Sequence, residues 1–253
     1  MPTPFYHLSL AEEILAETSA LPEPTHALLA EHRADFLLGN TAPDVQVISG
    51  QPRKATHFFT LPLRLNEQVP WVQMLAVHPV LACFRQLPEA QAAFIAGYLC
   101  HLQADYDWVR DIFVPVFGQK SGWESFSRRL YLHNVLRAYL DREILPGLAD
   151  GTCSHLSTAA PDGWLPFVRD SELYQWRDFL TDQLKPGAQV QTVEVFAARQ
   201  GISPDEYYSL LNSHERMDQE VFSHLPRQQL GAYHQHILEE NLSLLASYLS
   251  VKS

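Results

Sequence analysis

His101 and Asp105 lie four residues apart and directly follow the apolar stretch Ala92–Cys100. Residues at i and i+4 of a helix share a face, so both side chains can reach one point in space. A surface ion pair is the commonest reason for such spacing, but the apolar residues here predict a central, buried helix. Ionisable groups there must be paired or bind something, because burying an isolated charge costs on the order of several kcal/mol. The pair therefore indicates a candidate metal site, and Gly97, one turn earlier, would let another backbone approach closely.

Two residues of an irregular segment offer further metal ligands. Asp44 directly follows a proline, and His57 directly precedes two phenylalanines. Taken singly, Asp44 fits an Asx turn and His57 fits a histidine packed on its aromatic neighbours. Their occurrence together with other histidines and aspartates favours a shared site, because histidine is the commonest metal ligand. The five candidate metal ligands are His7, Asp44, His57, His101 and Asp105.

Helices must position these side chains, because helical periodicity runs through nearly the whole chain and no alternating β pattern of useful length occurs. Ser9 and Glu12 form a capping box that predicts a helix start at Ser9, with His7 just upstream. The segments 41–60 and 148–166 contain proline and glycine without a sustained period and are predicted to be loops. The predicted helices cover about residues 9–19, 24–38, 71–76, 88–114, 123–145, 170–184, 192–200, 204–224 and 227–250. The expected fold is all-α, with residues 1–253 forming a single multi-helix domain around the central helix 88–114.

The composition limits the function classes. The net charge of −11 disfavours tight binding to duplex nucleic acid and to an anionic membrane surface. No apolar run approaches the roughly 18 residues of a transmembrane helix, and the N-terminus does not resemble a secretory signal. The three cysteines lack C-x-x-C spacing, which disfavours a cysteine zinc site or a disulfide framework. These features predict a cytoplasmic protein.

The order of the candidate ligands resembles the zinc-dependent phospholipase C family, which is related in fold to the P1-type nucleases. That family has an N-terminal histidine, a Gly-x-x-x-Pro-Asp turn, a histidine in the next loop and a helix carrying His-x-x-x-Asp. The corresponding residues here are His7, Gly39–Asp44, His57, His101 and Asp105, within roughly residues 5 to 112. The resemblance implies that Asp44, His57, His101 and Asp105 bind one zinc ion. It also implies that Asp105 bridges to a second metal ion, which His7 contacts.

The chain departs from the family pattern at three positions. Asp111 stands where the family has a further histidine, and the later His-x-x-x-Glu becomes His133 followed by Arg137. Secreted members also use a processed N-terminal tryptophan as a ligand, whereas this sequence begins Met1-Pro2. One or two metal ions are therefore expected rather than three. Asp111, His133 and Arg137 are candidates for a second metal or for substrate; Arg137 would bind a phosphate bidentately or pair with an aspartate on its own helix.

The leading interpretation is a metal-dependent phosphoester hydrolase, in which metal-activated water attacks a phosphodiester or phosphomonoester. Asp44 is the candidate catalytic residue, because it would hold that water or accept its proton. The expected cofactor is Zn²⁺, although a mixed N/O ligand set with two carboxylates would also accept Mn²⁺ or Fe²⁺. The expected partner is a small phosphoester. The alternative is a non-catalytic helical protein, in which four ligands close a structural metal site that ties segment 41–60 to the central helix.

Overall fold

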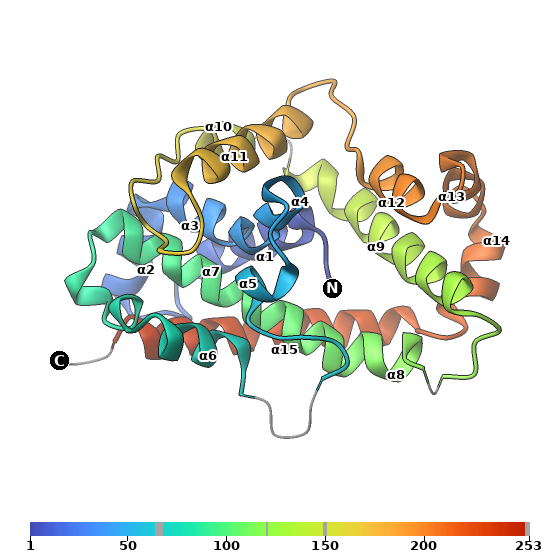
Figure 1. Cartoon of the computed structure of the whole chain (residues 1–253), viewed down its shortest axis with the longest axis horizontal. Helices are drawn as coiled ribbons and strands as arrows, with labels where there is room; N and C mark the ends of the chain where they lie inside the picture. The colour runs from blue at the N-terminus through green and yellow to red at the C-terminus, as the bar shows by residue number, and fades with distance from the viewer. Residues whose placement is uncertain (64–67, 120, 149–150, 251–253) are drawn as a thin grey trace.

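The computed structural model describes residues 1–63, 68–119, 121–148 and 151–250, and every regular element within these ranges is helical. The predicted all-α class is therefore confirmed (Figure 1). Among the described helices, none combines the length and apolar character needed to cross a membrane.

The α-helices, in chain order, are α1 (Pro4–Ala16), α2 (Glu23–Glu31), α3 (Arg33–Gly39), α4 (Gln46–Ser49), α5 (Arg53–His57), α6 (Pro70–Val77), α7 (Glu89–Asp107), α8 (Val114–Phe117), α9 (Phe126–Leu148), α10 (Thr152–Leu156), α11 (Asp170–Leu184), α12 (Thr192–Gln200), α13 (Pro204–Leu211), α14 (His214–Met217) and α15 (Arg227–Tyr248). Short 3₁₀ segments are η1 (Ala42–Val45), η2 (Pro79–Leu81) and η3 (Phe84–Gln86), and π-helical segments are η4 (Trp108–Phe113) and η5 (Asp218–Phe222).

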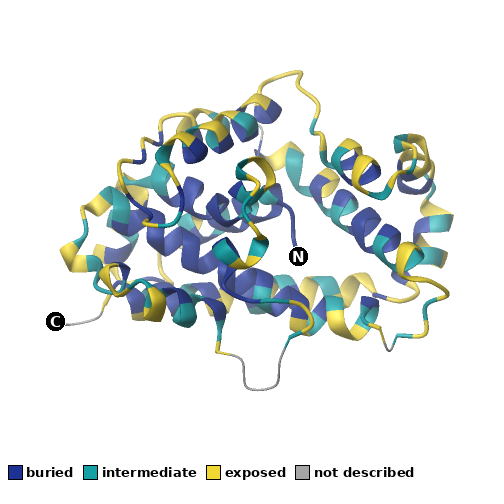
Figure 2. Ribbon diagram, in the orientation of Figure 1, coloured by how far each residue is buried: buried dark blue, intermediate teal, exposed yellow. Residues whose placement is uncertain are grey.

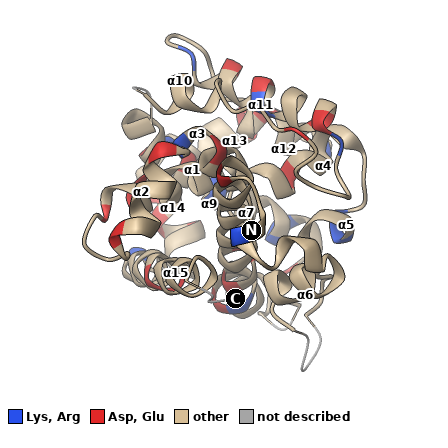
Figure 3. Ribbon diagram, turned by 90° about the vertical axis from the view of Figure 1, so that its left-hand side faces the viewer, with Lys and Arg blue, Asp and Glu red and all other residues tan. Residues whose placement is uncertain are grey.

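Helix α7 lies inside the molecule. It packs against α1, α2, α3, α6 and α15, and it is buried along nearly its whole length (Figure 2). Its residues 92–105 are all buried, polar side chains included. A helix that is apolar on all sides needs partners on all sides, and this requirement explains why α7 takes the interior position. The outer helices also carry many charged residues, for example the acidic ends of α2 and the basic residues of α5 (Figure 3).

The backbones of α3 and α7 touch at two glycines. A Cβ atom added to Gly39 would lie 2.0 Å from the carbonyl oxygen of Phe94, and one added to Gly97 would lie 2.3 Å from that of Phe36. Neither position has room for a side chain. The contact brings Asn40, the residue after α3, onto the part of α7 that carries His101.

The first helix begins earlier than predicted. It starts at Pro4, and the hydroxyl of Thr3 caps it by accepting a hydrogen bond from the amide three residues later (3.3 Å). Proline is preorganised for the first helical position, so Pro4 outweighs the capping-box pattern at Ser9. The prediction of a cap at Ser9 is therefore wrong, and His7 lies within the helix and is fully buried.

Segments expected to be loops contain short helices. Within 41–60 the chain forms η1, α4 and α5, and within 148–166 it forms α10. Pro43 occupies the first turn of η1, where its missing amide hydrogen costs no bond, and Pro52 is the N-cap of α5. Gly50 ends α4 in a left-handed conformation (φ 71°). Proline and glycine here delimit helices rather than prevent them.

Three predicted helix boundaries also shift. The predicted helix 24–38 breaks at His32 into α2 and α3, and 204–224 divides into α13, α14 and η5. The chain after α7 does not stop at Pro115, because η4 and α8 continue the helical path to Phe117. A π-helical turn between α7 and α8 is of the kind often found at functional sites.

The later helices cover the earlier ones. α15 runs alongside α7 and α1, and α9 packs against α1, α8, α12 and α13 (Figure 1). The hydroxyl of Tyr233 in α15 donates to the carbonyl of Ala104 (2.9 Å), and that of Tyr248 donates to the carbonyl of Leu81 (2.8 Å). These bonds join distant parts of the chain through buried groups.

Candidate metal centre

Helix α7 brings His101 and Asp105 together in the core. Their side chains are 0% and 1% exposed, and His101 Nε2 lies 3.7 Å from Asp105 Oδ2. The i, i+4 spacing thus places both on one face, as predicted. This face points away from solvent, toward η1, α5 and α1.

The segment between α3 and α6 supplies two more side chains. Asp44 lies on η1 and His57 is the last residue of α5. His57 Nε2 is 3.4 Å from Asp44 Oδ1, 3.3 Å from Asp105 Oδ2 and 3.4 Å from His101 Nε2. Two short helices therefore carry these residues to the face of α7.

Helix α1 completes the cluster with His7. Its ring stacks on that of His101 with centroids 3.8 Å apart, and its Nε2 lies 3.4 Å from Asp105 Oδ1. Both ring nitrogens of His7, and Oδ1 of Asp105, are buried and have no hydrogen-bond partner among the described residues. Buried polar atoms are normally paired, so these unpaired atoms require an explanation. A cation between them would provide one.

A backbone carbonyl and a threonine hydroxyl orient two of the histidine rings. His101 Nδ1 donates to the carbonyl of Asn40 at 2.7 Å, which leaves Nε2 facing the cluster. His57 Nδ1 lies 3.0 Å from the hydroxyl of Thr56. Metal-binding histidines usually have such a partner on the second ring nitrogen, since it fixes the tautomer and the ring orientation. The close contact of α3 with Gly97 therefore positions a candidate metal ligand, His101.

The sequence interpretation missed Arg53, which forms an ion pair with Asp105 and stacks 4.7 Å from the ring centroid of Phe59. Arg53 lies four residues before His57, so both share one face of α5. This i, i+4 spacing could have indicated Arg53 from the sequence, because it equals the spacing of His101 and Asp105 on α7. The guanidinium shares in neutralising Asp105, a carboxylate that is otherwise buried among histidines.

Burial sets the protonation states. Burial and the charge of His101 lower the pKa of His7 to about 4, so its ring is neutral at neutral pH. Burial alone would raise the pKa of Asp105, but the charges of His101 and Arg53 outweigh it and hold the pKa well below its ordinary value. Burial likewise opposes ionisation of Asp44, and the hydrogen bond from His57 reverses the effect and lowers its pKa. The neutral imidazole of His7 and the ionised carboxylates of Asp44 and Asp105 are thus in the states that bind a metal ion.

The five predicted ligands form two overlapping groups that share His101. One comprises His7, His101 and Asp105, and the other comprises Asp44, His57 and His101. Within each group the candidate ligand atoms all lie within 4.8 Å of one another. Imidazole nitrogens and carboxylate oxygens are ligands that Zn²⁺ accepts, so the donor set fits zinc.

Comparison with known proteins agrees with this geometry. Residues 6–108 match the model of a family described as zinc dependent phospholipase C. This segment, less than half of the chain, is therefore similar to the zinc-dependent phospholipase C family. The resemblance expected from the sequence is thereby confirmed, and zinc is the cofactor that this match implies. No curated protein and no solved structure matches the chain.

All five candidate ligands fall within the segment that matches the zinc-dependent phospholipase C model, whereas Asp111, His133 and Arg137 lie beyond it. Asp111 pairs with the neighbouring Arg110 (2.6 Å). Its carboxylate lies close to Asp107 and His236, and it belongs to neither of the groups that the five candidate ligands form. His133 accepts a hydrogen bond from Nε1 of Trp108 (2.9 Å). Burial, the N-terminal amino group and Arg137 hold the His133 pKa well below its ordinary value. The structure therefore places His133 in the core as a neutral side chain.

Arg137 alone of these three residues reaches the surroundings of the metal centre. It lines a cavity of about 220 Å³ together with Asp44 and Arg53. Burial lowers the pKa of Arg137 to about 10, with the charges of Asp44 and Asp141 acting in the opposite direction, so the guanidinium stays protonated at neutral pH.

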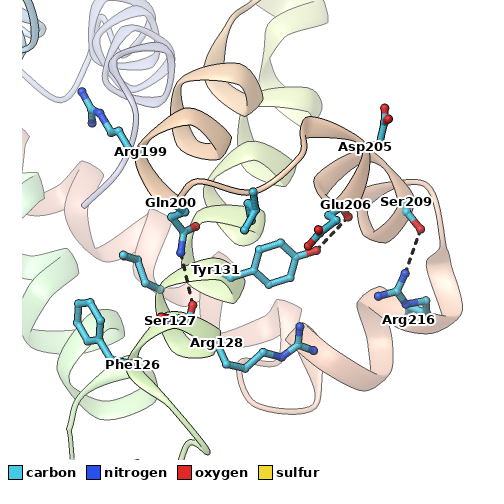
Figure 4. A pocket seen from close by; sticks show the side chains of 12 residues that line it. Phe126, Ser127, Arg128, Tyr131, Arg199, Gln200, Asp205, Glu206, Ser209 and Arg216 are labelled. Carbon is cyan, nitrogen blue, oxygen red and sulfur yellow. Dashed lines mark hydrogen bonds between the residues drawn. The ribbon is translucent and has the colours of Figure 1, made fainter.

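A larger cavity of about 750 Å³ lies between α9, α12, α13 and α14 (Figure 4). None of the five candidate ligands lines it. Tyr131 donates a hydrogen bond to the carbonyl of Glu206, and Arg216 donates one to Ser209. Several of its polar groups thus bond to one another, whereas the smaller cavity is lined by the candidate ligand Asp44.

Proposed function

We propose that this chain is a zinc-dependent phosphoester hydrolase whose first zinc ion is held by Asp44, His57, His101 and Asp105. The observation that carries the proposal is the position of Asp44. Its side chain is 17% exposed, faces the other ligands and also lines the 220 Å³ cavity. The cluster therefore opens onto a space for a small molecule, as a catalytic site requires.

Asp44 is the proposed catalytic residue. Its carboxylate is ionised, accepts a hydrogen bond from His57 and borders the cavity, so it can orient a water molecule and accept its proton. When bound, zinc supplies Lewis acidity toward a phosphoryl oxygen and lowers the pKa of water. Arg53 holds the charge of Asp105, which keeps that carboxylate from competing for the same proton.

His7 is proposed to hold a second ion, with Asp105 shared between the two. Asp105 Oδ1 faces His7, whereas Oδ2 faces His57 and His101. The two carboxylate oxygens thus point toward different histidines. Replacing His7 by alanine should lower the metal content by about one ion per chain, while the first ion stays bound. An unchanged metal count in His7→Ala would leave a mononuclear site.

The catalytic proposal is tested with zinc-loaded protein and bis(p-nitrophenyl) phosphate. Hydrolysis should be abolished by a chelator and restored by zinc. Asp44→Asn should lower kcat by about 10²- to 10⁴-fold, the usual contribution of general acid–base catalysis. Asp35→Asn is the matched control, since Asp35 also lies 3.4 Å from a histidine nitrogen but lines neither the cluster nor its cavity.

If the metal has only a structural role, a different result of chelation is expected. If chelation lowers the melting temperature while a broad panel of phosphoesters shows no turnover, the ion only ties η1 and α5 to α7. That outcome would overturn the catalytic proposal, and it would leave the ligand assignment standing.

A further inference from the structure

Arg137 has an unusual environment for a partly buried arginine. Its Nη1 donates to the side chain of Asn134 at 3.2 Å and its Nη2 donates to the carbonyl of Pro2 at 3.4 Å, both long bonds. Its Nε is buried without any hydrogen-bond partner, and no described carboxylate lies within ion-pair distance. A guanidinium carries five N–H donors, so most of them are uncommitted. The side chain is instead held by packing, 4.4 Å over the ring of Phe196.

The cavity beside Arg137 combines positive charge with apolar walls. Arg53 and Arg199 also line it, and Arg53 is the one of the three that pairs with a carboxylate of the metal centre. The apolar part of the wall includes Trp176, Phe179, Leu180, Val195 and Phe196. The cavity lining thus combines three guanidinium groups and Asp44 with an uncharged, largely aromatic surface, and Phe196 of that surface packs directly against Arg137.

We propose that Arg137 binds the phosphoryl oxygens of the substrate, and that the substrate is a small phosphoester whose ester group is apolar and carries no positive charge. This inference rests on the proposed hydrolase function and specifies its substrate class. A planar guanidinium binds two phosphate oxygens at once, which matches the uncommitted donors of Arg137. Three arginines outweigh the single carboxylate of Asp44 in the cavity lining, so we expect choline-type phosphoesters to be poorer substrates than uncharged ones. The volume of about 220 Å³ admits only a small ester group.

Inorganic phosphate is the direct probe of anion binding in this cavity. Calorimetric titration of the zinc-loaded protein with phosphate should show binding, and Arg137→Gln should weaken it at least tenfold with an unchanged zinc content. Arg129→Gln is the matched control, since Arg129 lies on the same helix, also stacks on an aromatic ring (5.0 Å) and does not line this cavity. Equal phosphate affinity in all three proteins would overturn the inference.

A folding defect in Arg137→Gln would not end the test. Arg137→Lys keeps the charge but lacks the planar fork, so its phosphate affinity should fall at least threefold while its melting temperature stays near that of the parent protein. Unchanged affinity in a folded Arg137→Lys protein would overturn the inference.

Substrate class is tested with two matched diesters, ethyl p-nitrophenyl phosphate and p-nitrophenylphosphorylcholine, which differ in the cationic group. The ethyl ester should have at least tenfold higher kcat/KM. Arg137→Gln should raise KM for the ethyl ester more than it lowers kcat. The same substitution should reduce the ratio of kcat/KM for the ethyl ester to that for the choline ester. A preference for the choline ester would contradict the substrate class. If neither ester is turned over, the hydrolase proposal fails, and the phosphate titration still decides the role of Arg137.

Discussion

Asp105 contacts three of the other four candidate ligands and also pairs with Arg53. Its two oxygens lie 3.4 Å from His7, 3.3 Å from His57 and 3.7 Å from His101, and it pairs with Arg53. Loss of this carboxylate removes one ligand and also leaves the Arg53 guanidinium without a counter-charge. The centre should therefore depend on Asp105 more than on any aspartate outside it.

Asp105→Ala should bind substantially less zinc than the parent protein, whereas Asp111→Ala should keep its full complement. The two aspartates lie on adjoining helical turns, but Asp111 pairs with Arg110 and does not face the five ligands. Elemental analysis of both purified variants, expressed with added zinc, provides the measurement. Equal metal loss in the two variants would contradict the ligand set.

For the placement of individual site residues, spacing within a helix was the most informative feature of the sequence. His101 and Asp105 could be placed on one face because the period of a helix fixes their relation. The approach of His7, Asp44 and His57 depends on tertiary packing, and it was anticipated only through family resemblance. Asn40 could not have been predicted as a partner of His101, because the bond uses a backbone carbonyl that every residue has.

Among the elements, the contact between α3 and α7 constrains the site most directly. Gly97→Ala would force a methyl group to within about 2.3 Å of a backbone oxygen on α3, so the helices must separate. We expect a loss of several kcal/mol in unfolding free energy, similar to overpacking of a core, and weaker zinc binding through displacement of Asn40.

Gly231→Ala is the control for this substitution. Gly231 lies in α15, and a methyl group there meets no atom within 4 Å. The change should stabilise the protein by about 0.5–1 kcal/mol through helix propensity alone. Chemical denaturation of both variants gives the comparison, and equal stability of the two would show that α3 and α7 tolerate separation.

Asp141 joins three elements, because it accepts hydrogen bonds from Thr3 at the start of α1 and from Thr192 at the start of α12 (2.6 Å). Burial raises its pKa to about 6, and these hydrogen bonds and Arg137 oppose the rise. A raised pKa in the folded state means that folding favours the protonated form. Its stabilising contribution is full below pH 4 and is lost as the pH rises through about 6.

Asp141→Asn should therefore gain stability relative to the parent protein between pH 4.5 and pH 7.5. A shift of about two pKa units corresponds to about 3 kcal/mol, which sets the upper bound of the effect. The free energy of unfolding is measured by urea denaturation of both proteins at both pH values. Both proteins are kept metal-free, so that release of zinc at low pH does not contribute to the difference. A stability difference that does not change with pH would contradict the assignment.

The helical class and most long helices could be read from the apolar periodicity. The breaks at His32 and after α13, and the start of α1, could not, because each depends on competition between local signals of similar strength. One example is the competition between Thr3 with Pro4 and Ser9 with Glu12, in which the proline at the first helical position sets the helix start. Short helices such as α4 and α5 carry too few residues for a period to be recognised.

At the scale of the molecule, we propose that the chain folds as one domain, although the family match covers only residues 6–108. α15 packs on α7 and α1, and Nε1 of Trp176 in α11 donates to the carbonyl of Thr41 (2.9 Å). These contacts cover apolar surface that residues 6–108 would otherwise expose to water.

A fragment of residues 1–118 should therefore fail to fold by itself. We expect the full chain to show a single cooperative thermal transition, while the fragment shows none and self-associates. Calorimetry and sedimentation give the two measurements. A cooperative transition in the isolated fragment would identify the matched segment as a separate domain.

The position of α15 also has a consequence for biosynthesis. All five candidate ligands are translated by Asp105, but the helix that packs over α7 and α1 ends only at Tyr248. During elongation the face of α7 that α15 covers remains exposed, a period in which the nascent chain is prone to aggregation. Zinc that arrives early meets a site still open to exchange, and completion of α15 then encloses its surroundings.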